Sequence, residues 1–556
     1  MLKKVTPLGK GLIFDFLHVL LMALKYFPLL PYLKEFLMIN TKKLLSAFSA
    51  LSIFLSFVMV IIPSTLLSSD EISIENEKIS AVIEKFEQIS SVPRCSGKEK
   101  NITKMLKQWS KSNDLKFKKD SKGNVLIEVP ATKGFEKYPT IVLQGHLDMV
   151  CEKNPDSDHN FEKDPLKLRY DTDWLTAQGT TLGADNGIGI ALCMALVEDK
   201  NVSHPPLELL FTVEEETGLK GAINLKPGFI KGKIFINVDS EGEGVLTIGS
   251  AGGTVTLITL PTTIKKLPKE FELFSLQVSG LRGGHSGVDI NKGRGNSIKI
   301  MAGVMDALNN TSQIRLVNFK GGSRVNAIPQ NALASLAFDS GMIGRFKEIV
   351  ATYEQNIQKK YTSTESDVSI TLTEEREKKP KKAISQKDTQ KIIDLIRSLP
   401  DGVFAMSSKF EGNVETSNNI GQANFKQNNF VAMSMERSAD MKKIDGLHSL
   451  IQSEAKKTGA KAKIVDKWSA WEPNRDSELL QRSIKVYNTT FGRDPKIQVI
   501  HAGLECSVIV AKNPQIDMIA IGPTIENAHS VNERLYIPSV GNVWEFLTTL
   551  LASYGQ

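Results

Sequence analysis

The sequence has 556 residues, of which 41% are hydrophobic and 24% charged, with 40 Gly and 22 Pro. This composition is typical of globular proteins and excludes a disordered, collagen-like or low-complexity chain. The net charge of +7, from 69 basic and 62 acidic residues, is too dilute for a nucleic-acid-binding surface, so no nucleic-acid partner is expected. At roughly 150 residues per domain, the length predicts three or four structural units.

The first clear signal along the chain is a run of 19 uncharged residues at positions 44–62. A run of that length can span a bilayer. Lys42 and Lys43 precede it and acidic residues follow it, which orients the N-terminus toward the cytoplasm and the rest of the chain outside. We therefore predict an exported or membrane-anchored protein. A cleaved signal starting at Met38 and a core helix of a soluble domain are the alternatives.

Residues 76–252 alternate helical and strand patterns. Helical periodicity lies at residues 72–89, 102–109 and 188–197, and apolar strand-like runs lie at residues 141–143, 207–213 and 235–238. Strands separated by helices predict an α/β layer around a largely buried sheet.

Residues 253–468 show a different pattern, with strand-like segments at 273–278 and 332–338 and a helical segment at 297–308. This pattern predicts a second, α+β domain. The α/β pattern resumes in residues 469–556, with a helix at 476–491 and strands at 497–500 and 518–521. We therefore predict an α/β catalytic domain in two parts (76–252 and 469–556), an inserted α+β lid domain (253–468) and an N-terminal extension (1–75).

The four cysteines are Cys95, Cys151, Cys193 and Cys506. They are widely spaced and form no CxxC motif, so the pattern favours buried free thiols over a disulfide scaffold or a thiolate zinc site.

Five short segments place acidic residues or histidines where a strand should end: QGHLDMV, LGADNGIG, TVEEETG, INVDSEG and ENAHSVNE. Their candidate residues are His146, Asp148, Asp185, Glu214, Glu215, Glu216, Asp239 and His529. Loops beyond the carboxyl ends of strands in an open α/β sheet converge on one site. Two imidazoles and several carboxylates suit a pair of zinc-like divalent ions.

The residue types suggest how such a site would work. Asp185 could bridge two ions roughly 3.5 to 4 Å apart, and Asp148 could orient His146 from the same side of an extended segment. Of the adjacent Glu215 and Glu216, one could bind metal while the other acts as general base toward water. Taken singly, each segment could equally be a surface cap or a solvated helix start. The motifs HExxH, GxSxG and GxxxxGK[ST] are absent from the sequence.

Further segments carry a resemblance to a known family: SGLRGGHSGVDI, GGSRVNAIP, VETSNNIG, HAGLECS and GPTIENAHSVNERL. From about Asn76 to the C-terminus the chain resembles the two-zinc amino- and carboxypeptidases with an inserted lid domain. Within that clan it is most similar to the aminoacyl-histidine dipeptidases. The resemblance implies a two-zinc exopeptidase-like catalytic domain with a central mixed sheet, interrupted by the α+β lid.

The resemblance also implies a set of metal ligands for two divalent ions, with zinc favoured and manganese or cobalt as alternatives. Asp185 bridges both ions. The remaining ligands are His146 and Asp239 on one ion and Glu216 and His529 on the other.

The same resemblance assigns roles to residues that do not bind metal. Asp148 orients the first histidine ligand, and Glu215 is the general base. His285, in the lid, stabilises the developing oxyanion. Asn326 and Arg437 correspond to substrate-binding positions, and the guanidinium of Arg437 suits the C-terminal carboxylate of a dipeptide.

The predicted function is a metal-dependent dipeptidase that hydrolyses unblocked dipeptides, Xaa-His and carnosine-like substrates among them, through a metal-bridged hydroxide. Two alternatives stay open: an N-acyl amino-acid deacylase with the same two-metal site, and a non-catalytic, membrane-anchored peptide-binding protein. The family is named as cytosolic, so a cytoplasmic location is the alternative to export. Whether the lid forms a homodimer also stays open.

Overall fold

The computed structural model describes residues 71–375 and 380–555. The chain divides into two units, residues 1–74 and 75–556. The predicted export segment at 44–62 lies outside the described residues. Of the helices within the described ranges, none combines the length and the hydropathy of a membrane span.

Two large sheets form the second unit, and the first is a mixed sheet of eight strands. In spatial order its strands are β1 (Lys116–Lys119), β2 (Val125–Val129), β6 (Leu207–Thr212), β3 (Ile141–His146), β7 (Ile234–Asn237), β23 (Asp517–Ala520), β8 (Val245–Ser250) and β22 (Lys496–Ile500). Strand β3 runs parallel to both β6 and β7, and β7 runs parallel to β23. The predicted α/β class with a central mixed sheet is confirmed.

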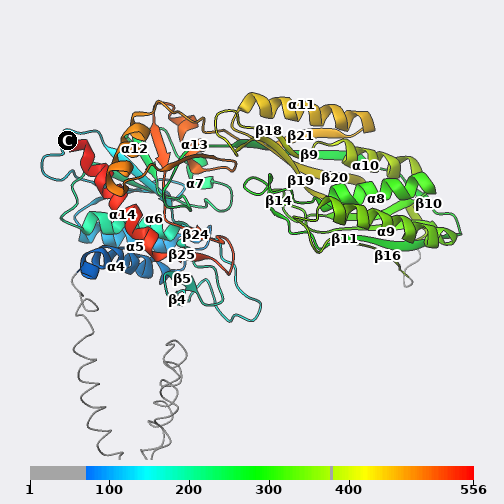
Figure 1. Ribbon diagram of the computed structural model, residues 1–556, viewed down its shortest axis with the longest axis horizontal. Helices are drawn as coiled ribbons and strands as arrows, with labels where there is room; N and C mark the ends of the chain where they lie inside the picture. The colour runs from blue at the N-terminus through cyan, green and yellow to red at the C-terminus, as the bar shows by residue number, and fades with distance from the viewer. Residues whose placement is uncertain (1–70, 376–379, 556) are drawn as a thin grey trace, which may run out of the picture. The chain divides into compact units, whose positions relative to one another are not determined.

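Alternate residues of the central strands enter different cores, so the sheet is buried on both faces. In β3, Ile141 and Leu143 join the core on one face, whereas Val142 joins the core on the other. This double burial explains why the central strands read as continuous apolar runs in the sequence. The first core includes α4 (Glu71–Ser90), α5 (Lys100–Ser112), α6 (Ala184–Glu198), α12 (Glu478–Phe491) and α14 (Ile537–Ala552), and the second includes α7 (Lys220–Asn224) and α13 (Glu505–Lys512) (Figure 1).

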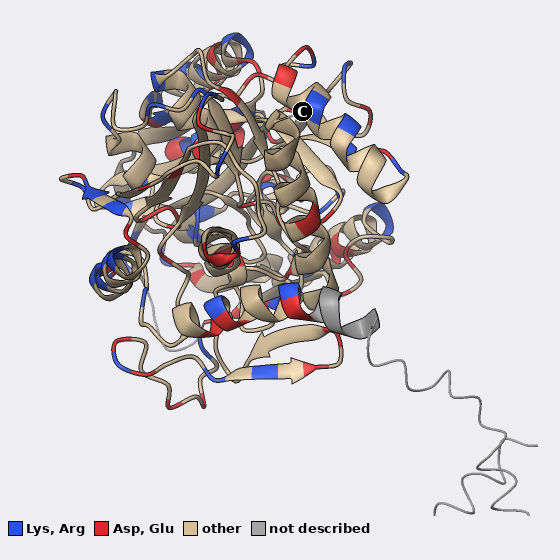
Figure 2. Cartoon of the chain, turned by 90° about the vertical axis from the view of Figure 1, so that its left-hand side faces the viewer, with Lys and Arg blue, Asp and Glu red and all other residues tan. Residues whose placement is uncertain are grey.

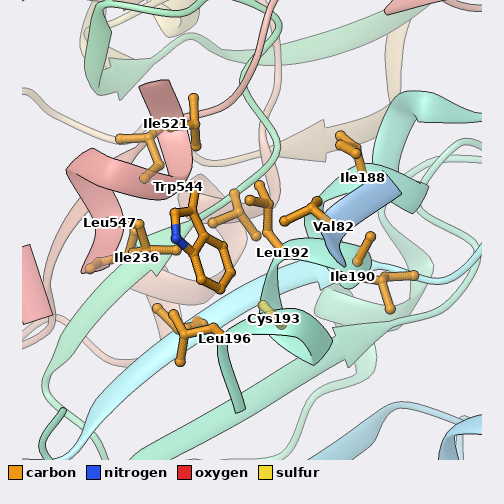
Figure 3. Packing of buried hydrophobic residues seen from close by; sticks show 14 of the residues in the cluster. Val82, Ile188, Ile190, Leu192, Cys193, Leu196, Ile236, Ile521, Trp544 and Leu547 are labelled. Atoms are coloured by element: carbon orange, nitrogen blue, oxygen red, sulfur yellow. The ribbon is translucent and has the colours of Figure 1, made fainter. Parts of the chain in front are cut away.

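Helix α6 is apolar on all sides and is buried almost throughout, as expected for a helix without a polar face. Figure 3 shows Leu192, Cys193 and Leu196 of this helix in one cluster with Trp544 and Leu547 of α14. Tight packing of this kind holds the first turn of α6, which carries Asp185, at a fixed place beside the sheet.

The second sheet is antiparallel. Its strands are β16 (Ser369–Glu374), β11 (Phe271–Ser279), β15 (Ala332–Asp339), β13 (Arg315–Gly321), β19 (Val414–Lys426), β20 (Asn429–Ser438), β9 (Gly252–Pro261) and β21 (Lys461–Trp468), with β18 (Gly402–Met406) paired to β19. The helices that pack against it are α8 (Ser297–Thr311), α9 (Ile343–Lys360), α10 (Gln386–Ser398) and α11 (Met441–Thr458) (Figure 1). The chain enters this sheet at Gly252, directly after β8, and returns to the first sheet at Lys496. The predicted domain limits themselves stay a prediction.

Three smaller sheets complete the described strands. They are β10 (Ile264–Lys266) with β17 (Lys382–Ile384), β12 (Gly284–His285) with β14 (Ala327–Ile328), and a four-stranded sheet of β24 (Ile525–Glu526), β25 (Arg534–Tyr536), β5 (Trp174–Ala177) and β4 (Leu168–Asp171). The described part of the chain also contains two 3-10 helices, at Ser340–Met342 and Ser553–Gly555. Lysine, arginine and acidic residues are interspersed over the helices and loops of the face in Figure 2.

The cysteine prediction is half wrong. Cys193 and Cys506 are free and buried, as expected, but Cys95 and Cys151 form a disulfide. The chain brings them together because Cys95 pairs with Met149 in a parallel β-bridge, which places the two cysteine Cα atoms 5.7 Å apart. Their separation of 56 residues along the chain gives no sign of this contact.

Candidate metal centre and active site

The structure brings the five predicted metal ligands together at one edge of the eight-stranded sheet. His146 is the last residue of β3, Glu216 follows β6, and Asp239 follows β7. Asp185 lies in the first turn of α6, and His529 lies in the loop after β24. Three of the five therefore leave the carboxyl ends of neighbouring parallel strands, which is where such sheets place their sites.

Asp185 lies between the two histidines and reaches each with a different carboxylate oxygen. Its Oδ1 is 2.9 Å from His146 Nε2, and its Oδ2 is 3.0 Å from His529 Nε2. His146 Nε2 is also 3.4 Å from Asp239, and His529 Nε2 is 3.0 Å from Glu216. The contacts fall into two groups joined by Asp185, an arrangement in which one carboxylate can serve two ions.

The donor set fits divalent cations. Ligand atoms of His146, Asp185 and Glu216 lie within 4.8 Å of one another. One oxygen each of Glu216 and Asp239 is buried without a hydrogen-bond partner among the described residues. Burial raises the pKa of Asp239 to about 7, and the negative charges of Asp185 and Glu216 add to the shift. Bound cations would relieve this crowding of carboxylates, and a set of nitrogen and oxygen donors without thiolates suits zinc, manganese or cobalt.

Asp148 contacts three of the candidate site residues and helps to position them. His146 Nδ1 lies 3.1 Å from the backbone carbonyl of Asp148 and 3.5 Å from its carboxylate. The carboxylate instead accepts hydrogen bonds from the backbone N–H groups of Glu215 (3.0 Å) and Glu216 (3.2 Å). Asp148 therefore contacts His146 through its main chain and fixes the two glutamates through its side chain.

The three consecutive glutamates have different surroundings. Glu214 has a φ of 51° and forms ion pairs with Lys122 (2.6 Å) and Lys220 (2.7 Å), away from the candidate ligands. Burial raises the pKa of Glu215 well above its usual range, and the charge of Glu216 adds to this effect. The left-handed backbone at Glu214 turns the chain so that the next two side chains face the cluster.

Arg94 supports the site, although no motif or spacing in the sequence singles it out. Its buried guanidinium donates hydrogen bonds to the carbonyl oxygens of Leu147 (3.1 Å), Asp148 (2.9 Å) and Gly183. Gly183 has a φ of +67°, and a Cβ there would lie 2.6 Å from Nη2 of Arg94. Glycine at this position therefore allows both the left-handed turn into α6 and the close approach of the guanidinium.

Two buried glutamates near the ligands were also missed, although the motifs HAGLECS and ENAHSVNERL contain them. Glu533 accepts hydrogen bonds from the N–H groups of Leu182 (2.8 Å), Gly183 (2.9 Å) and Asp185 (3.3 Å). Glu505 accepts from Gln144 and Thr212, both at 2.6 Å. Burial raises the pKa of Glu533 to about 7 and that of Glu505 to about 8.

The lid residues His285 and Arg437 converge on one point. His285 Nδ1 accepts hydrogen bonds from the N–H groups of Gly287 and Val288, both at 3.3 Å. This bonding assigns the imidazole proton to Nε2, which lies 3.5 Å from Nη2 of Arg437. Burial and the charge of Arg437 lower the pKa of His285 to about 3, so the ring is neutral. Two donors therefore lie side by side there, an arrangement suited to binding anionic oxygens.

Arg437 is buried on β20, and burial lowers its pKa to about 10. No carboxylate within residues 71–375 and 380–555 forms an ion pair with it, and its neighbours are Ser286 Oγ at 3.4 Å and the ring of Trp468. Asn326 is exposed, and its backbone carbonyl accepts a hydrogen bond from Ser286. A buried guanidinium without a counter-charge is suited to bind a carboxylate.

His501, also missed from the sequence, joins the two sheets beside this pair. It follows β22, and its Nε2 lies 2.7 Å from Oγ of Ser417 on β19, a residue whose register partner on β20 is Arg437. A Cβ on Gly287 would lie 2.1 Å from the carbonyl oxygen of His501. The segment that carries His285 and Gly287 therefore packs directly against the residue that follows β22.

Comparisons with known proteins show which family the chain belongs to. The model of peptidase family M20/M25/M40 matches residues 142–553. The chain belongs to this peptidase family. One relative, the cytosol non-specific dipeptidase of Escherichia coli (strain K12), is 38% identical over 84% of this chain and 96% of its own length. The crystal structure of the aminoacylhistidine dipeptidase from Vibrio alginolyticus superimposes with a TM-score of 0.73 at 36% identity, covering 85% of this chain and 96% of that one.

These matches confirm the predicted resemblance and the prediction of a hydrolase that acts on peptide bonds. The individual roles of the ligands, Asp148, Glu215, His285, Asn326 and Arg437 stay predictions, because no comparison tests them.

Proposed function

We propose that the protein is a two-metal dipeptidase that hydrolyses unblocked dipeptides, Xaa-His and carnosine-like peptides among them. The observation that carries the proposal is the joining of two histidine–carboxylate groups through Asp185. The two dipeptidases described above, both more than one-third identical to this chain, support the choice of substrate class.

In this proposal each of the two histidine–carboxylate groups described above binds one ion. His146 and Asp239 would hold one ion, Glu216 and His529 would hold the other, and Asp185 would serve both. When bound, the two ions would polarise the scissile carbonyl and lower the pKa of a water molecule. Zinc is the preferred metal, with manganese and cobalt as alternatives for the same donors.

Glu215 is the general base in this proposal. It takes a proton from the attacking water and passes it to the leaving nitrogen, which must be protonated before the peptide bond can break. Burial supports this role because it raises the pKa of Glu215 and so makes the carboxylate a better proton acceptor. Asp148 orients Glu215 and Glu216 by binding their N–H groups.

The lid supplies the anion-binding groups. His285 donates from Nε2 to the oxygen on which charge develops, and Arg437 binds the C-terminal carboxylate of the dipeptide. Asn326 belongs to the same substrate site in this proposal. Its backbone carbonyl accepts a hydrogen bond from the N–H of Ser286, the residue next to His285. An arginine that binds the C-terminal carboxylate would favour peptides short enough to place that carboxylate and the scissile bond in the same site.

A substrate panel tests the function. The full chain is stripped of metal, reloaded with zinc, manganese or cobalt, and offered a free dipeptide, an N-acetyl amino acid and a tripeptide. We expect rapid cleavage of the dipeptide alone. Preference for the acylated amino acid would establish the deacylase, and binding without cleavage would establish the peptide-binding protein.

Location and assembly go beyond the residues described. We propose that residues 44–62 direct the chain to the membrane, and protease protection of fractionated cells tests this. Full-length protein found wholly in the cytoplasmic fraction would contradict it. A homodimer formed through the lid stays a prediction.

A further inference from the structure

We propose that the Cys95–Cys151 disulfide is a reducible brace behind the active site, so that peptide hydrolysis depends on the redox state of this pair. The proposal rests on the function proposed above for its activity readout. Nothing in the metal or substrate chemistry requires the disulfide, and its place in the fold gives it this role.

The disulfide covalently joins the segment around Cys95 to the segment around Cys151. Hydrogen bonds also connect these two segments, from the residues on either side of Cys95. On one side of Cys95, the carbonyl of Arg94 accepts a hydrogen bond from Met149 N–H (3.2 Å), and the guanidinium of Arg94 binds the carbonyl of Asp148. On the other side, Oγ of Ser96 donates to the carboxylate of Asp148 at 2.7 Å. The disulfide therefore adds a covalent link beside the hydrogen bonds by which Arg94 and Ser96 hold Asp148 in place.

Asp148 passes this constraint to the reacting groups. It is fully buried, and it contacts His146 through its carbonyl and the N–H groups of Glu215 and Glu216 through its carboxylate. A small shift of Asp148 would move a metal ligand and the general base together. Catalysis is sensitive to such shifts, since a displacement of about 1 Å can cost about 100-fold in rate.

The disulfide is within reach of reductants. Cys95 and Cys151 are partly exposed, whereas Cys193 and Cys506 are fully buried. A dithiol attacks one sulfur, forms a mixed disulfide, and leaves as its own cyclic disulfide, so that two electrons and two protons end on the two protein thiols. The core of α4, α5, α6 and α14 does not include either cysteine, so we expect the fold to survive reduction.

The cellular compartment would determine whether Cys95 and Cys151 are oxidised or reduced. Disulfides persist in oxidising compartments and are rare in the cytosol. If residues 44–62 export the chain, the brace forms and the enzyme is active; a chain retained in a reducing compartment would be held in the slower form.

The test compares oxidised and reduced full-length enzyme. The reductant is a phosphine, tris(2-carboxyethyl)phosphine, because a dithiol would also chelate zinc. In denaturant we expect two reactive thiols before reduction and four after it. Reduction should lower kcat by about 10- to 100-fold with metal content unchanged, and reoxidation should restore it. Four reactive thiols in untreated enzyme purified from an oxidising compartment would overturn the proposal, as would full activity after reduction.

A variant and a second measurement separate this proposal from the proposed function. The double variant Cys95→Ser/Cys151→Ser should match the reduced enzyme and should not respond to phosphine. Hydrogen exchange of residues 147–151 should rise on reduction whether or not the protein cleaves dipeptides. Unchanged exchange would overturn the brace, while raised exchange in a protein that cleaves no dipeptide would overturn only the dipeptidase.

Discussion

The edge of the eight-stranded sheet and the lid carry opposite kinds of polar group, carboxylates in the first and hydrogen-bond donors in the second. At the sheet edge, burial raises the pKa of Asp239 to about 7 and that of Glu505 to about 8. In the lid, burial lowers the pKa of Arg437 to about 10 and that of His285 to about 3. Each region carries polar groups that it cannot satisfy alone: carboxylates that need cations, and donors that need an anion.

The difference between the regions separates metal binding from substrate recognition. Changes at the sheet edge should alter metal content, whereas changes in the lid should alter kinetics and leave the metals in place. Substitutions at single residues test this division.

The largest effect should follow removal of the bridge. Asp185→Ala should lose both metals and all measurable activity, because it removes the carboxylate that serves two ions and offsets their mutual repulsion. His529→Ala should lose mainly one metal. Metal content per chain after desalting decides this, with Asp171→Ala, an exposed carboxylate on β4, as the matched control. Two metals retained by Asp185→Ala would show that the bridge is misassigned.

Substitution of the proposed general base should slow turnover without lowering metal content, although the residue lies at the same sheet edge as the metal ligands. Glu215→Gln keeps the shape of the side chain but removes the proton acceptor, so it should slow turnover by about 10²- to 10⁴-fold at normal metal content. Glu216→Gln should weaken one metal instead.

The matched control is Glu214→Gln, which lies on the same turn but pairs with Lys122 and Lys220. It should retain near-normal turnover. An inactive Glu214→Gln beside an active Glu215→Gln would place the base one residue earlier.

In the lid, His285→Ala should lower kcat by about 10²- to 10³-fold with both metals present, since an oxyanion donor acts mainly in the transition state. Steady-state kinetics and metal analysis of the same preparation measure this. A change in KM alone would instead assign His285 to ground-state binding.

Arg437→Met should give the smallest effect. The loss of one charge-assisted contact, about 1.5 to 3 kcal/mol, corresponds to about a 10- to 150-fold fall in kcat/KM for free dipeptides. Dipeptide amides lack the carboxylate and should be affected much less. Equal losses for acids and amides would contradict the assigned contact.

Local signals were sufficient to predict the sheet edge. Strands β3, β6 and β7 are buried on both faces and read as apolar runs, and their polar ends mark His146, the glutamates and Asp239. The support behind them was not predictable from the sequence. Arg94 reaches Gly183 across 89 residues, and Glu533 reaches the same turn across about 350. Contacts of that range depend on the order of strands and on packing, which neither periodicity nor spacing reveals.

The cysteines show the same limit. Wide spacing correctly predicted that Cys193 and Cys506 are buried thiols, because both lie on helices packed against the sheet. The same argument failed for Cys95 and Cys151, which meet only because residue 95 pairs with residue 149.

The central claim is that the crowded carboxylates hold two ions used for dipeptide hydrolysis. The most direct test titrates the metal-free chain with Zn²⁺ while hydrolysis of a free Xaa-His dipeptide is followed. We predict two ions bound per chain and activity that needs both, with Glu215→Gln binding the same two ions yet staying slow. Saturation at a single ion, or dipeptide hydrolysis that persists in the metal-free chain, would contradict the account.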